Sequence, residues 1–207
     1  MANLQDQFGQ IDIYLFDQIL RGRIMPGMRV LDAGCGSGRN LVYLMQSGYD
    51  VSATDASPDA IATVRRLAAV LAPHLTAGSF RVEPVERMSF PGAFADVVIS
   101  SAVLHFASDD AQFEAMLFEM WRVLAPGGLL FVRLASTIGM ERRVRHIEGR
   151  RFHLPDGSER YLVDEAMLAG LTRRLGSELL DPLKTTVVQD QRAMTTWVVR
   201  KGLETQP

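Results

Sequence analysis

The feature that most constrains the fold is a regular alternation of short apolar runs with amphipathic helical patterns between residues 28 and 134. The apolar runs have the length of strands, and several are rich in β-branched residues. A chain that alternates strand and helix folds into a parallel sheet with helices on both faces. The sequence therefore predicts a doubly wound, Rossmann-like α/β fold, with strands at residues 28–33, 50–54, 79–83, 95–100 and 129–134.

The segments on either side of this alternation complete the predicted domain. Apolar residues at helical spacing predict a helix over residues 10–20, within an N-terminal helical lid of residues 1–27. Residues 138–163 are predicted to be an insertion in which PDGS is the turn of a hairpin. After a short helix that starts at Asp164, two late strands join the sheet edge. We expect one domain over residues 1–207, whose seven-stranded sheet is mostly parallel with an antiparallel C-terminal strand.

Composition and charge limit the kinds of partner that the chain can bind. The net charge of −2 at pH 7 gives no general attraction to nucleic acid or to anionic membranes. No apolar run reaches the length of about 18 residues that a membrane span needs, and the first residues lack a signal-peptide pattern. Cys35 is the only cysteine, so no internal disulfide forms and a reducing, cytoplasmic location is expected. No metal site is predicted.

The segment VLDAGCGSGRN, residues 30–40, follows the first predicted strand and carries three glycines at alternate positions. Ligands of doubly wound sheets bind outside the carboxyl ends of the strands, and glycine lets them approach the backbone. Asp55 closes the second strand, where an acid can accept hydrogen bonds from ribose hydroxyls. The glycine spacing matches neither the dinucleotide fingerprint nor the phosphate loop of ATPases. A ligand that carries a ribose is therefore predicted, with a ligand-free tight turn as the alternative.

Four segments together carry a resemblance to a known family: VLDAGCGSG, ATDAS, FADVVISSAVLHF and WRVLAPGGLLFV. Over residues 28–134 the chain resembles the class I S-adenosylmethionine-dependent methyltransferases. The stretch GCGSGRNLVYLMQSGYDVSATD is further similar to the tellurite-resistance-type branch of these enzymes, which acts on small molecules. The resemblance implies S-adenosylmethionine as cofactor, S-adenosylhomocysteine as product and methyl transfer as the reaction.

The resemblance also implies roles for individual residues. Asp32 would orient the glycine loop near the amino-acid part of the cofactor, Asp55 would accept both ribose hydroxyls, and Ala56 would lie along the adenine. The segment that begins at Ser100 would run beside the methionine part. The cofactor-binding residues predicted in this way are Asp32, Gly34, Cys35, Gly36, Gly38, Asn40, Asp55, Ala56, Val85, Glu86, Ser100 and Ser101.

The adenine contact departs from the family pattern. The family often places an acid after the third strand, and this acid bonds the adenine amino group. Here Pro84 stands at that position. The side chain of Glu83 or Glu86, or the backbone of Val85 or Glu86, would then take its place.

Four further residues are candidates for the chemistry and for binding the methyl acceptor. His105 follows the fourth strand and is predicted as a catalytic base or orienting group, with a packed histidine as the alternative. Arg133 lies in an apolar strand, so it needs an acidic partner or an anionic ligand, and the acidic partner is favoured. Arg39 and Tyr14 are candidate substrate contacts, although a solvated helix start and helix packing explain them as well.

A small-molecule methyl acceptor is the favoured partner. The Asn-Pro-Pro-aromatic motif, which in related enzymes accompanies methylation of amides and many nucleic acids, is replaced by Ser-Ser-Ala-Val after the fourth strand. A non-catalytic protein with this fold is one alternative. An RNA methyltransferase guided by the arginine-rich insertion is another. A monomer or a homodimer is expected.

Overall fold

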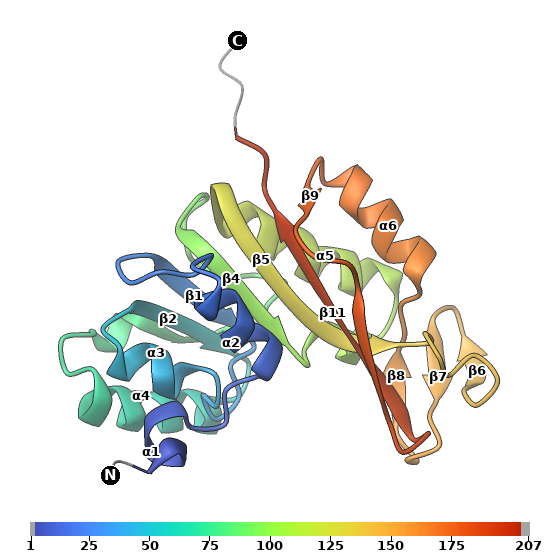
Figure 1. Ribbon diagram of the computed structural model, residues 1–207, viewed down its shortest axis with the longest axis horizontal. Coiled ribbons are helices and arrows are strands. Elements are labelled where there is room, and N and C mark those ends of the chain that lie inside the picture. Colours follow the sequence, from blue (N-terminus) through green and yellow to red (C-terminus); the bar gives the residue numbers. More distant parts are fainter. Residues whose placement is uncertain (1–2, 204–207) are drawn as a thin grey trace.

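A computed structural model describes residues 3–203 and shows one twisted sheet flanked by helices (Figure 1). The strand order is β3-β2-β1-β4-β5-β11-β10, and the short β9 pairs with β11. The five strands from β3 to β5 are parallel, β11 is antiparallel to β5, and β10 is antiparallel to β11. These strands are β1 (Arg29–Ala33), β2 (Asp50–Asp55), β3 (Phe80–Val82), β4 (Ala95–Ser101), β5 (Leu124–Ser136), β9 (Glu178–Leu179), β10 (Lys184–Val188) and β11 (Arg192–Arg200).

The predicted doubly wound α/β sheet with an antiparallel C-terminal strand is therefore confirmed. Helices connect the parallel strands and cover both faces of the sheet. They are α1 (Leu4–Phe8), α2 (Ile13–Leu20), α3 (Leu41–Gln46), α4 (Pro58–Leu71), α5 (Asp110–Val123) and α6 (Glu165–Arg174), with short 3₁₀ turns η1 (Ala77–Ser79) and η2 (Leu104–Phe106).

Two apolar cores lie on opposite faces of the sheet because successive strand residues point in opposite directions. In β1, Val30 joins the core formed with α2, α3 and α4, whereas Leu31 joins the core formed with α5 and α6. Burial on both faces explains why these strands are continuous apolar runs rather than alternating ones. The two cores fix the carboxyl ends of β1, β2 and β4 beside one another.

The insertion is larger than a hairpin. The predicted pair is present as β7 (Arg151–His153) and β8 (Glu159–Tyr161), and β6 (Arg145–Glu148) adds a third antiparallel strand. The sequence-based hairpin was incomplete because β6 is polar and mostly exposed, so it carries no apolar pattern. Tyr161 anchors the small sheet to α5: its hydroxyl donates to Asp110 at 2.7 Å, and its ring stacks on Phe113.

Two further elements differ from their predicted limits. The N-terminal segment forms two helices, α1 and α2, separated at Gly9, whose positive φ of 59° interrupts the helix. Strand β5 starts at Leu124 rather than residue 129, because an irregularity in its pairing with β4 accommodates Pro126, Gly127 and Gly128. Residues 1–2 of the predicted lid lie outside the described residues. Among the described residues no helix is long and apolar enough to cross a membrane.

Candidate functional site

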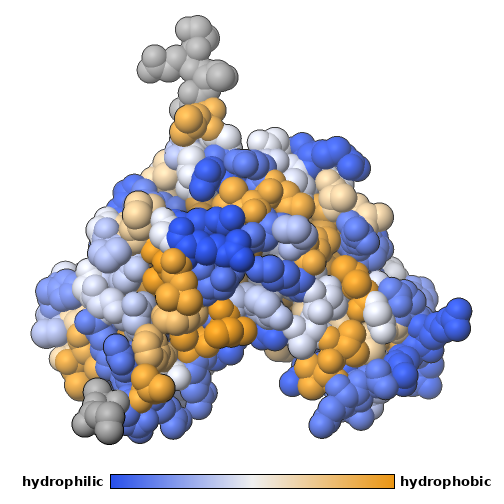
Figure 2. All heavy atoms as spheres, viewed as in Figure 1, coloured by the Kyte–Doolittle hydropathy of each residue, from blue (hydrophilic) through white to orange (hydrophobic). Residues whose placement is uncertain are grey.

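A cavity of about 400 Å³ opens at the carboxyl ends of β1, β2 and β4. In the view of Figure 2 the molecule is hollowed along its lower edge, between the part that carries the N-terminal helices and the small three-stranded sheet. We call the cavity of about 400 Å³ the glycine-loop cleft. Its lining residues are Gly34, Cys35, Gly36, Ser37, Arg39, Asn40, Asp55, Ser101, Ala102, Val103 and Phe106.

The glycine loop needs its glycines for two different reasons. Gly34, Gly36 and Gly38 all have positive φ, at 81°, 53° and 81°, a region that side-chain-bearing residues rarely adopt. A Cβ on Gly34 would lie 2.6 Å from a methyl carbon of Val103, so packing also excludes a side chain there. A Cβ on Gly36 would meet nothing within 4 Å. The loop is therefore tightly packed at Gly34 and open at Gly36, where a ligand can approach the backbone.

Asp55 holds this loop in place with its side chain. Its two carboxylate oxygens accept hydrogen bonds from the backbone of Gly36 at 2.8 Å and of Ser57 at 2.9 Å. A carboxylate offers about four acceptor sites, so each oxygen keeps a further site for a hydroxyl donor. The arrangement fits a ribose diol bound at the end of β2.

Asp32 is a buried carboxylate with an unused oxygen. The residue is 1% exposed, and its Oδ2 has no hydrogen-bond partner among the described residues. Burial raises the pKa of this carboxyl from 3.8 to about 7, Arg39 opposes the change, and Asp55 adds to it. An orphaned acceptor of this kind behind the glycine loop fits a positively charged or hydrogen-bond-donating ligand group.

Cys35 lines the cleft but has the environment of a packing residue. It is buried, and its Sγ contacts the carbonyl of Gly36. Burial, reinforced by the charges of Asp32 and Asp55, raises the pKa of the thiol far above its usual range. The thiolate needed for nucleophilic chemistry is therefore absent at neutral pH.

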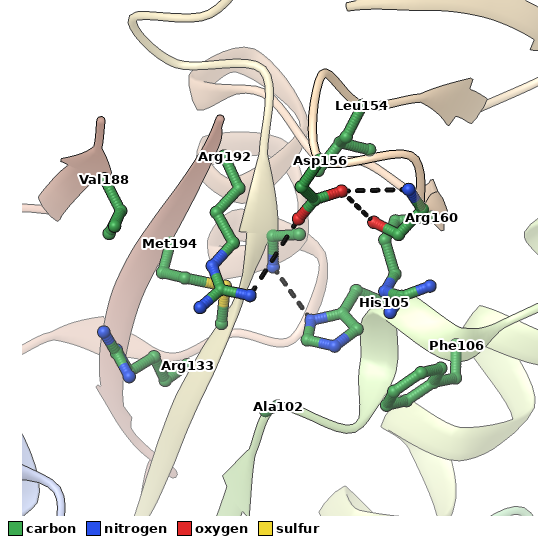
Figure 3. A pocket seen from close by; sticks show the side chains of 12 residues that line it. Ala102, His105, Phe106, Arg133, Leu154, Asp156, Arg160, Val188, Arg192 and Met194 are labelled. Atoms are coloured by element: carbon green, nitrogen blue, oxygen red, sulfur yellow. Dashed lines mark hydrogen bonds and ion pairs between the residues drawn. The ribbon is translucent and has the colours of Figure 1, made fainter. Parts of the chain in front are cut away.

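A second cavity of about 290 Å³ adjoins the cleft, and Ala102 and Phe106 line both. We call it the arginine pocket, because Arg133, Arg160 and Arg192 enter it from β5, β8 and β11 (Figure 3). The remaining lining residues are His105, Ala135, Leu154, Asp156, Ser158, Val188 and Met194. Ala102, at the boundary, has a φ of 66°, a strained conformation of the kind that clusters at functional sites.

His105 faces the arginine pocket with one ring nitrogen already used. Its Nδ1 accepts the backbone N–H of Ala135 at 3.1 Å (Figure 3). Burial, together with the charges of Arg160, Arg192 and Arg133, lowers the pKa of the imidazole to about 4. The neutral ring therefore carries its proton on Nε2, where it can donate a hydrogen bond but cannot accept a proton. This geometry favours the orienting role over that of a base.

Asp12 is the central residue that the sequence analysis missed. It is buried at the start of α2 and forms ion pairs with Arg133 at 3.0 Å and with Arg39 at 3.8 Å. Its carboxylate also accepts the N–H of Tyr14, and its own N–H donates to the amide oxygen of Asn40. The acidic partner favoured for Arg133 is therefore present. The available signal was an aspartate near the N-terminal end of the predicted helix, a place where aspartate is common as a helix cap.

The structure brings some predicted residues to the cleft and leaves others behind it. Seven line it: Gly34, Cys35, Gly36, Arg39, Asn40, Asp55 and Ser101. Arg39 also donates to the hydroxyl of Ser101 at 2.8 Å. Six do not line it, namely Asp32, Gly38, Ala56, Val85, Glu86 and Ser100. Tyr14 lines neither cavity, because its hydroxyl shares a hydrogen bond with Thr186 of β10, so the structure supports its packing alternative.

The two acids beside Pro84 are engaged within the protein. The carboxylate of Glu83 accepts hydrogen bonds from the backbone and hydroxyl of Ser89, and Glu86 accepts one from Gln112 at 3.2 Å. The backbone at Val85 or Glu86 is therefore the better candidate for an adenine contact. Among residues 3–203 no cluster of three or more histidine, cysteine or acidic side chains could hold a metal ion.

Comparison with known proteins extends this picture. The family model described as "Methyltransferase domain" matches residues 31–132. The malonyl-[acyl-carrier protein] O-methyltransferase of Serratia marcescens is 35% identical over 116 residues, which cover 56% of this chain and 42% of that protein. The chain thus matches less than half the length of this curated relative.

Two solved structures show the same fold. An S-adenosylmethionine-dependent methyltransferase from Methanosarcina mazei has a TM-score of 0.74 at 22% identity, over 90% of this chain and 98% of that one. The 1,6-didemethyltoxoflavin-N1-methyltransferase of Burkholderia thailandensis, solved with S-adenosylhomocysteine, has a TM-score of 0.69 at 21% identity, over 94% and 80%. The tellurite-resistance-type branch stays a prediction. Residues 31–132 thus match the methyltransferase family model, and the chain has the fold of S-adenosylmethionine-dependent methyltransferases.

Proposed function

We propose that this protein transfers a methyl group from S-adenosylmethionine to a small-molecule acceptor. The observation that carries the proposal is the junction of two cavities at Ala102 and Phe106. The glycine-loop cleft has the donor groups, acceptor groups and open backbone that a nucleoside ligand needs. The adjoining arginine pocket is a separate compartment in which a second molecule can meet the first.

The residues of the cleft fit the cofactor by their chemistry. Asp55 would accept the ribose hydroxyls while it holds Gly36, and the buried carboxyl group of Asp32 behind the loop would favour the positively charged amino-acid part through its charge. S-adenosylmethionine supplies a methyl group on a positively charged sulfur, which keeps the electron pair of the broken C–S bond when a nucleophile takes the methyl. The protein's main task is then to align two molecules and exclude water.

The acceptor would be oriented by His105. Its Nε2–H donor enters the arginine pocket from η2, and the hydrogen bond from Ala135 fixes the ring. A fixed donor positions an oxygen or nitrogen of the acceptor without removing a proton from it. We therefore expect His105→Ala to lower turnover while S-adenosylmethionine affinity stays unchanged, as measured by kinetics and calorimetry. Unchanged turnover would remove His105 from the mechanism.

The relatives support a small acceptor. The relatives named above are methyltransferases of malonyl-[acyl-carrier protein] and of 1,6-didemethyltoxoflavin. The RNA alternative finds less support, because Arg143, Arg150 and Arg151 of the insertion form ion pairs with acids of the chain. Cytoplasmic location and a monomeric or homodimeric state remain part of the proposal.

Calorimetric titration with S-adenosylmethionine, with NAD as comparator, tests the proposal. We expect binding of S-adenosylmethionine alone, and loss of at least tenfold in affinity in Asp55→Ala, since charge-assisted hydrogen bonds are worth about 1.5–3 kcal/mol. Asp50→Ala is the matched control, because Asp50 lies exposed at the other end of the same strand. Absence of S-adenosylmethionine binding would overturn the proposed function. Binding without S-adenosylhomocysteine release across a broad acceptor panel would favour the non-catalytic alternative.

A further inference from the structure

We infer that the arginine pocket selects an acceptor with a carboxylate on a compact apolar body. That the ligand is a methyl acceptor rests on the proposed function. Its chemical class is argued from the side chains that line the pocket. Three guanidinium groups and one carboxylate, that of Asp156, line the pocket, and they come from separate parts of the fold (Figure 3). Such convergence of arginines is a recognised way to bind a planar anion.

The three arginines differ in how far the chain already neutralises them. Arg133 is paired with Asp12 at 3.0 Å, although its Nε is buried without a hydrogen-bond partner. Arg160 forms no ion pair among the described residues. It donates to the carbonyl of Glu159 at 2.6 Å and lies over the ring of Phe106, at 4.8 Å from the centroid. Positive charge therefore remains beside the boundary with the cleft.

Arg192 is the best placed of the three to grip a ligand. Within residues 3–203 its one ion pair is with Asp156 at 3.9 Å, which is longer than a hydrogen bond. Asp156 is itself held by the backbone and hydroxyl of Ser158, at 2.9 and 2.6 Å. Most N–H groups of the Arg192 guanidinium thus stay free for the two parallel bonds that a carboxylate can accept.

The apolar residues of the pocket indicate what the rest of the ligand is like. Phe106, Leu154, Val188 and Met194 bring apolar surface to the same cavity. Its volume of about 290 Å³ lies at the lower end of the range for ligand pockets. A compact acid, with an apolar body and one carboxylate, matches both the size and the division into apolar and cationic surface.

Binding of small acids to the protein saturated with S-adenosylhomocysteine tests the inference. The probes are butyrate, hexanoate and benzoate, each paired with its neutral amide, and inorganic phosphate as a general anion. We expect at least one acid to bind about tenfold or more tightly than its amide, and phosphate to compete weakly. Arg192→Ala should abolish the preference for the acid, and Arg192→Lys, which keeps the charge without the fork, should restore only part of it.

Arg200→Ala is the matched control, because Arg200 is an exposed arginine at the opposite end of β11 and should leave the preference intact. No preference for any acid, or a preference that survives Arg192→Ala, would overturn the inference. Phosphate binding as strong as that of the acids would also overturn it, in favour of an unselective anion site. The same titrations without cofactor separate the two proposals, since failure to bind S-adenosylmethionine bears on the function and not on the acid preference.

Discussion

Asp32 gives the sharpest test of how the cleft is built, because its burial sets both stability and ligand binding. Its carboxyl pKa is 3.8 unperturbed and about 7 in the folded protein. The folded state therefore binds more protons than the unfolded state between these pH values, and stability falls as pH rises through this window. Each pKa unit corresponds to about 1.4 kcal/mol, so the full penalty approaches about 4 kcal/mol above pH 7.

The substitution Asp32→Asn removes this titration and keeps the shape of the side chain. The stability of the variant relative to the parent should rise by roughly 2 kcal/mol between pH 5 and pH 7 and level off above it. Urea unfolding followed by circular dichroism at pH 5, 6, 7 and 8 measures the difference. Asp50→Asn, exposed on the neighbouring strand, controls for the loss of one negative charge.

A second readout connects this carboxylate to the ligand. A cationic ligand group near Asp32 would keep it ionised, so binding of S-adenosylmethionine near pH 6.5 should release a proton. Calorimetry in two buffers of different ionisation enthalpy detects the release, which should vanish in Asp32→Asn together with much of the affinity. A stability difference that is flat from pH 5 to pH 8 would refute the reasoning, because it would mean that burial leaves the carboxyl unperturbed.

Two further predictions concern the parts that hold the cleft together. Asp12→Asn keeps the helix cap but removes the charged partner of Arg133. The free energy of unfolding, measured with urea, should fall by about 2–3 kcal/mol, and α2 should become sensitive to proteolysis. An unchanged urea midpoint would contradict this. Gly34→Ala forces a Cβ against Val103 and should cost more than about 2 kcal/mol, whereas Gly36→Ala carries backbone strain alone, of about 1 kcal/mol. If Gly34→Ala and Gly36→Ala have the same melting temperature, the contact of the new Cβ with Val103 does not destabilise the protein and the argument fails.

The parts of the fold that depend on short sequence patterns could be predicted from the sequence. Apolar runs gave the parallel strands, and the glycine spacing with Asp55 located the cleft. Strand β6 was not predicted because it is polar and mostly exposed and carries no apolar period. The sequence analysis predicted a helix over residues 10–20 but not α1, because a helix of five residues is too short to show an apolar period.

The arginine pocket could not be predicted from the sequence for a different reason. Its arginines come from residues 133, 160 and 192, and only the folding of the insertion against β5 and β11 brings them together. Arg133 alone stood out, because a charged residue in an apolar strand is conspicuous. Arg192 opens the last predicted strand and carried only a weak signal, and Arg160 carried none. Convergence of distant residues has no local signature, so the pocket required the structure.

The two cavities differ in the charged side chains that line them, and Asp12 pairs with one arginine of each. Its single negative charge offsets part of the positive charge of Arg39 and Arg133, and Asp55 adds a carboxylate to the cleft that favours a cationic ligand group. The arginine pocket beyond Ala102 keeps its remaining cations and favours negative charge. If the proposed function and the inferred acceptor both hold, a sulfonium and a carboxylate-bearing molecule would meet across this boundary. Each reactant would then bind on the side whose charged residues favour it, and the buried Asp12 at the start of α2 would pair with an arginine on both sides.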